Sequence, residues 1–165
     1  MDIYSLENAI RSFFDGHVSS SRRECNDLAC SLLGGGPIVP FTIQGQFSYT
    51  VFLPQAISKV RLGEDGSNKP SSDAKIVQFR LNNSKINIYV AQLAKAIHGD
   101  IAAETEYHGE IGQEAGSRLS VYIIQKLPGV TYIEMGNFSV KMTAKQASKQ
   151  LRMIEDLARY GKPCT

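Results

Sequence analysis

The stretch Lys75–Leu81, which reads KIVQFRL, decides the fold because it alternates as a β-strand does. The alternation places Ile76, Gln78 and Arg80 on one face and Val77, Phe79 and Leu81 on the other. Two polar side chains therefore lie on one side of a strand that is otherwise largely apolar. A buried polar group needs a hydrogen-bond partner. Gln78 and Arg80 are thus expected either to bond to neighbouring groups of the protein or to line a cavity that takes a ligand.

The residues before this strand predict two helices and a hairpin. Apolar residues at helical spacing predict a helical N-terminal segment over 1–34, with one helix in 4–14 and a second that begins at the serine run Ser19–Ser21. Beta-branched and aromatic residues then predict strands over 38–43 and 47–53, joined by a turn. In the second of these strands, alternation places Phe47, Tyr49 and Val51 on one face and Ser48, Thr50 and Phe52 on the other.

The residues after Leu81 predict a helix that ends at Gly99, two further strands over 104–110 and 119–126, and a C-terminal helix over 143–160. The first of these helices has the apolar positions Ile86, Val90, Leu93, Ala94 and Ile97. The last helix opens with a capping box and is expected to bury Ala147, Leu151, Ile154 and Leu157. The sequence therefore predicts an α+β fold over 1–165 as a single domain, with a five-stranded antiparallel sheet, one inserted helix, two N-terminal helices and one C-terminal helix.

Composition excludes several classes of function. The chain has 18 basic and 16 acidic residues, so the net charge is only +2, and no nucleic-acid partner is expected. Three cysteines without a paired motif, and no histidine at ligand spacing, predict neither a disulfide framework nor a metal site. No apolar run approaches the length of a membrane span. We expect a cytoplasmic protein without a cofactor, a metal or a membrane partner.

Four stretches in order resemble the N-terminal lobe of fungal aminoglycoside-phosphotransferase-like (kinase-like) proteins. They are 44–51 (QGQFSYTV), 76–80 (IVQFR), 94–99 (AKAIHG), and 121–122 (VY) continued by 127–133 (LPGVTYI). The resemblance covers about 25–160 and implies a kinase-like lobe over 37–133. The C-terminal lobe, which holds the magnesium ligands and the catalytic carboxylate in this family, has no counterpart in the chain.

The chain also departs from the family where phosphate would bind. Gln78 stands at the position of the family's lysine and cannot pair with phosphate as a charge. The loop that would cover phosphate has one glycine, Gly45, so side chains occupy space that the backbone needs. His98-Gly99-Asp100 imitates the start of the family's catalytic loop but lies at the end of a predicted helix. Neither phosphoryl transfer nor tight nucleotide binding is expected.

General acid-base chemistry has one weak candidate. His108 lies between Glu106 and Glu110 at strand spacing, which places the three side chains on one face if the strand is regular. We interpret the group as a solvated edge of the sheet.

A lone kinase-like lobe would leave one face of its sheet without the partner lobe. A helix folded over that face would enclose a pocket, whereas a second copy of the chain would make a homodimer. The first hypothesis is a cofactor-free cyclase or isomerase for a hydrophobic fungal natural-product intermediate, similar to Diels–Alder cyclases such as norbornene synthase. Its predicted catalytic residues are Gln78, Arg80 and Tyr49, and its predicted substrate-binding residues are Phe47, Val51, Ile76, Tyr122 and Ile124. The alternative is a catalytically inactive, pseudokinase-like module that binds a small molecule or another protein.

Overall fold

The computed structural model describes residues 4–54 and 74–128, and in the C-terminal segment residues 143–144, 147–148, 151–152 and 154–155. The chain divides into two compact units, Met1–Pro128 and Gly129–Thr165. The described part of the predicted C-terminal helix is helical, with the amide of Ala147 donating to the carbonyl of Thr143 at 3.0 Å. Leu151 and Ile154, which were expected to be buried there, are exposed. The rest of that predicted helix lies outside the described residues.

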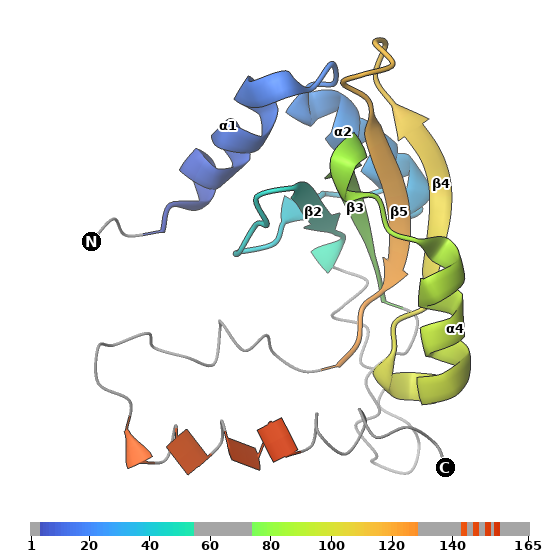
Figure 1. The fold of residues 1–165 in the computed structure, drawn as a ribbon. Coiled ribbons are helices and arrows are strands. Elements are labelled where there is room, and N and C mark those ends of the chain that lie inside the picture. The colour runs from blue at the N-terminus through green and yellow to red at the C-terminus, as the bar shows by residue number, and fades with distance from the viewer. Residues whose placement is uncertain are drawn as a thin grey trace. The chain divides into compact units, whose positions relative to one another are not determined.

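Two N-terminal helices cover one face of the sheet (Figure 1). Helix α1 (Leu6–His17) begins after Ser5, and helix α2 (Arg22–Leu32) begins with a capping box in which Ser21 and Glu24 bond to each other's backbone amides. An ion pair of 3.0 Å between Arg22 of α2 and Glu7 of α1 joins the helices at the surface. Their buried side chains and the sheet form the core, which includes Ile10, Phe13, Cys25, Ala29, Tyr49, Val51, Val77, Phe79, Leu119 and Val121.

The sheet has five antiparallel strands in the order β1-β2-β3-β5-β4, which confirms the predicted fold class. The strands are β1 (Val39–Pro40), β2 (Ser48–Phe52), β3 (Lys75–Leu81), β4 (Thr105–Ile111) and β5 (Leu119–Gln125). The central strand β3 has the predicted bounds. It pairs with β2 on one side and with β5 on the other, so it is the axis of the sheet.

Strand β1 is much shorter than the predicted strand over 38–43, and after Pro40 one backbone bond, from the amide of Phe41 to the carbonyl of Thr50 at 3.0 Å, is supplemented by a side chain. The Gln44 amide donates to the carbonyls of Phe41 and Thr50 at 2.9 and 3.0 Å, and its oxygen accepts from the amide of Thr50 at 2.8 Å. The amide of Thr50 is thereby satisfied by a side chain, whereas its carbonyl accepts from both Gln44 and the backbone of Phe41.

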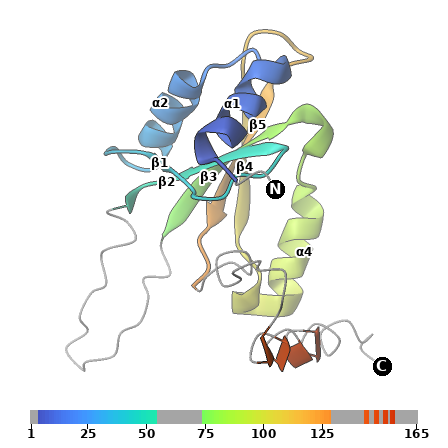
Figure 2. The same ribbon diagram turned by 90° about the vertical axis from the view of Figure 1, so that its left-hand side faces the viewer.

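The second face of the sheet is more polar and is approached by helix α4. A short turn of helix, η1 (Asn82–Ser84), leads from β3 into α4 (Ile88–His98), which is followed by η2 (Gly99–Ile101). Figure 2 shows α4 on the side of the sheet opposite α1 and α2. None of the eleven residues of α4 is buried. Three positions of its predicted apolar repeat, Val90, Leu93 and Ile97, are exposed rather than packed on the sheet.

Candidate functional site

The side chains of Gln78 and Arg80 form hydrogen bonds with each other and with two neighbouring residues. The Gln78 amide nitrogen donates to Thr50 Oγ1 at 3.0 Å, and Arg80 Nη1 donates to Gln78 Oε1 at 3.0 Å. Arg80 Nε donates to the carbonyl of Ser84 at 2.6 Å, which ties β3 to the turn before α4. Of the two outcomes expected from the sequence, the structure therefore has the first, in which protein groups supply the partners.

The three residues predicted as catalytic do not lie on one face of the sheet. In the register of β2 and β3, Thr50 lies opposite Gln78, whereas Tyr49 lies opposite Phe79. Tyr49 is fully buried under α1 and α2, where its hydroxyl donates to Asn26 Oδ1 at 2.9 Å. Burial raises the pKa of this phenol, although its bonds to Arg22 and Asn26 act in the opposite direction. The predicted grouping of Tyr49 with Gln78 and Arg80 is wrong. In this register the even-numbered residues of β2 share a face with Gln78 and Arg80, whereas Tyr49 points to the opposite face.

The predicted substrate-binding residues divide in the same way. Val51 pairs with Val77 in the core, so its predicted place beside Gln78 is also wrong. Phe47 precedes β2 and is partly exposed. Three predicted residues do share the face of Gln78 and Arg80, namely Ile76, Tyr122 and Ile124. The Tyr122 hydroxyl accepts from the amide of Ile86 at 3.1 Å, so it holds the segment that leads into α4.

A groove between α4 and β4 lies next to these residues. It has a volume of about 680 Å³, within the range of small-molecule sites. It is lined by Ile88, Gln92, Lys95 and Ala96 of α4, by Glu104, and by Thr105, Glu106 and Tyr107 of β4. The Tyr107 ring lies 5.4 Å from the ring of Tyr122, and Thr105 pairs with Ile124. The groove is thus one strand away from the position predicted from the sequence.

The charged side chains around the groove differ in whether they have a partner. Lys95 Nζ lies 3.7 Å from Asp100 Oδ1 and donates to Gln125 Oε1 at 3.4 Å, so this ammonium group already has partners. Glu104 and Glu106 form no ion pair with a described residue. Glu106 pairs with Ile123 and so lies on the opposite face of β4 from Tyr107, which leaves Glu104 as the carboxylate that favours a neutral or cationic ligand over an anionic one at the rim.

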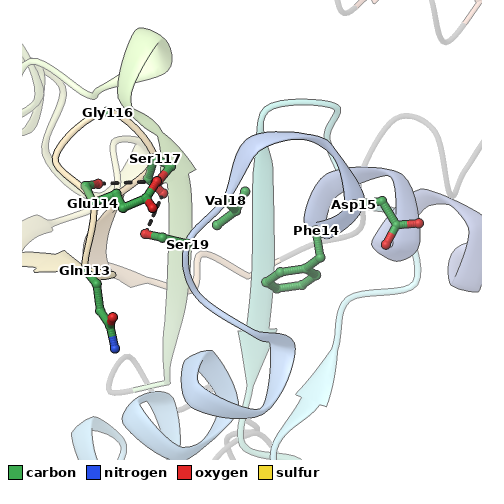
Figure 3. Close-up of a pocket in the computed structure, with 8 residues that line it drawn as sticks. All are labelled: Phe14, Asp15, Val18, Ser19, Gln113, Glu114, Gly116 and Ser117. Carbon is green, nitrogen blue, oxygen red and sulfur yellow. Dashed lines mark hydrogen bonds between the residues drawn. The ribbon is translucent and has the colours of Figure 1, made fainter.

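A second pocket, between the end of α1 and the β4–β5 turn, has a volume of about 550 Å³ (Figure 3). Its polar groups bond to each other: the Ser19 hydroxyl donates to the carbonyl of Ser117 at 3.3 Å, and the Ser117 hydroxyl donates to the carbonyl of Glu114 at 3.4 Å. The carboxylates of Asp15 and Glu114 lie at opposite ends of the pocket and do not converge (Figure 3). We interpret this pocket as part of the contact through which the N-terminal helices pack against the sheet.

The predicted acid-base group is divided by a β-bulge. The register of β4 against β5 shifts between Tyr107 and Gly109, so His108 is the extra residue. Glu106 then pairs with Ile123 and Glu110 with Ser120, which places the two glutamates on opposite faces. The predicted common face of these residues is therefore wrong. Glu110 is engaged by Lys85, whose Nζ lies 2.7 Å from Glu110 Oε1.

Comparisons with protein-family models, with curated proteins and with solved structures found no match. The described residues contain no group of three or more potential ligands that could hold a metal ion. None of the described helices has the length and the apolar content that a membrane span requires.

Proposed function

We propose that the chain is a small-molecule-binding module and that its site is the groove between α4 and β4. The observation that carries the proposal is the lining of this groove, which combines apolar atoms of Ile88, Ala96 and Tyr107 with polar ends at its rim. Small-molecule sites typically have this composition, with a few polar groups that orient an otherwise apolar ligand. This is the alternative function predicted from the sequence, placed one strand further along the sheet.

The expected ligand has an apolar body and is neutral or carries a positive charge. Tyr107 is 44% exposed, so part of this residue is available for contact with an aliphatic group or an ammonium group. Glu104 disfavours a carboxylate or a phosphate at the rim. Gln92 supplies a donor and an acceptor that would orient a carbonyl or a hydroxyl of the ligand.

The cyclase hypothesis stays a prediction, and the geometry supports it less well. A cyclase would need donors that converge on one carbonyl of the substrate. Gln78 instead donates to Thr50, Arg80 donates to Ser84 and to Gln78, and Tyr49 lies on the other face. The resemblance to a kinase-like lobe, the fungal biosynthetic setting and the cytoplasmic location likewise remain expectations.

The chain contains no tryptophan, so one introduced tryptophan reports on the groove alone. We expect Tyr107→Trp to transfer excitation energy to the neutral apolar dye prodan when the dye occupies the groove. The matched control adds Ala115→Phe, at an exposed position of the turn between β4 and β5, to this reporter variant and should leave the dye affinity unchanged. Adding Ala96→Phe to the reporter variant fills the groove and should weaken dye binding at least tenfold.

Two results would contradict the proposal. One is an equal change in dye affinity after Ala96→Phe and after Ala115→Phe, which would indicate that the dye does not bind in the groove. The other is unchanged dye affinity after Ala96→Phe in a variant whose circular dichroism spectrum matches that of the parent.

A further inference from the structure

The outer side of α4 has the character of a protein interface. On a helical wheel, Tyr89, Leu93, Ile97 and Val90 span an arc of about 100°. Their exposed fractions are 73%, 46%, 63% and 56%, and Ile101 of η2 continues the surface at 56%. The side of α4 toward β4 instead carries Gln92 and Lys95. Apart from Ile88, which lines the groove, the helix therefore turns its larger apolar side chains away from the sheet, which is the reverse of an amphipathic helix that packs on its own domain.

The neighbouring edge of the sheet is protected against strand pairing. Strand β4 is the edge strand beside α4, and the bulge at His108 interrupts its ladder. Glu106 and Glu110 add charge to its two faces. Bulges and charges on an edge strand prevent a further strand from adding to the sheet. A partner on this side of the molecule would thus contact the side chains of α4 rather than extend the sheet.

We propose that a second copy of this chain binds to this surface, defined as Tyr89, Val90, Leu93, Ile97 and Ile101, through an antiparallel contact between the two α4 helices. The area is suitable. With about 100 Å² for each aliphatic side chain and about 200 Å² for tyrosine, the exposed fractions correspond to roughly 370 Å². Each partner in a standard interface contributes roughly 450 Å² of apolar area. The surface approaches that amount, so we expect a dimer with a dissociation constant in the micromolar range.

The spacing of the surface is self-complementary. Tyr89, Leu93 and Ile97 repeat every fourth residue and form one ridge along the helix. A two-fold axis at Leu93 places this residue against its own copy and places Tyr89 against Ile97 of the other copy. The net charge of +2 adds little repulsion between the copies. The small-molecule groove lies on a different side of α4, so the inference is independent of the proposed function.

Sedimentation velocity of the full chain over roughly 1–500 µM tests the proposal. We expect the sedimentation coefficient to rise with concentration to that of a dimer. Leu93→Glu should weaken association at least 100-fold, because both copies carry the change at the axis. The matched control is Gln92→Glu, which introduces the same charge one residue away but toward the groove, and it should leave association within about threefold.

A charge-reversal pair tests the antiparallel geometry. Tyr89→Lys and Ile97→Glu should each weaken association at least tenfold, since each removes an apolar contact at both ends of the ridge. The double variant should associate at least fivefold more tightly than the single variant with the lower affinity, because each lysine then faces a glutamate of the other copy. A chain that stays monomeric to 500 µM would overturn the inference and assign the surface to another occupant. A dimer that tolerates Leu93→Glu would overturn it as well.

Discussion

Replacing Gln78 by leucine removes the link between Thr50 and Arg80 and leaves the guanidinium group of Arg80 without an acceptor at Nη1. A hydrogen bond to a charged group contributes about 1.5–3 kcal/mol, and a neutral one about 1 kcal/mol. Because Gln78 and Arg80 are only partly buried, water replaces part of this interaction. We expect Gln78→Leu to lower the free energy of unfolding by about 2 kcal/mol, which lowers the Tm by roughly 4–8 °C in a chain of this size.

Urea denaturation followed by circular dichroism measures the effect, and a double-mutant cycle with Arg80→Met isolates the pair. Methionine keeps the aliphatic stem of Arg80 and removes its charge. The two changes should couple by about 1–2 kcal/mol. If each single variant stays within about 0.5 kcal/mol of the parent, the pair does not stabilise the fold, and our interpretation of Gln78 and Arg80 as structural residues is refuted.

Two further predictions follow from the pKa shifts. The hydrogen bond from Lys85 lowers the pKa of Glu110 below its ordinary value of 4.5, so this ion pair stabilises the fold above that pH and is lost as the pH falls below it. The stability difference between the parent and Glu110→Gln should therefore shrink between pH 5 and pH 3, and an equal difference in urea midpoint at both pH values would contradict this. Burial raises the pKa of the Cys25 thiol to about 12, so iodoacetamide at pH 8 should modify the half-exposed Cys30 well before Cys25. Mass spectrometry of the peptides measures both rates, and comparable labelling of the two thiols would show that the core around Cys25 opens readily.

The elements with strong local signals could be predicted from the sequence. The alternation of Lys75–Leu81 between turn-forming residues set the bounds of β3, and the serine run Ser19–Ser21 marked the start of α2. Strand alternation defines two faces for each strand, but it does not say which face of one strand continues on the next. That depends on register, which here pairs Tyr49 with Phe79 and so separates Tyr49 from Gln78.

The candidate site was harder to predict because its signals are non-local. The apolar repeat of α4 predicts a helix that packs on the core, and only the structure places Leu93 and Ile97 on the exposed side. The groove combines side chains that come from two separate segments, such as Ile88 and Tyr107, and no spacing in the sequence connects them. The bulge at His108 has one local signal in the sequence. This signal is the glycine that follows it, which adopts a φ of +108°.

The hydrogen bonds between Gln44 and strand β2 limit which residues can occupy position 44. Its side chain imitates a peptide group, since one atom donates to two carbonyls while the other accepts an amide proton. Glutamate has the same shape but would turn an oxygen toward both carbonyls, and asparagine is one methylene shorter. No other side chain can therefore replace all three of these bonds, although backbone bonds from Phe41 to Thr50 and from Ser48 to Gly45 also hold this end of the hairpin.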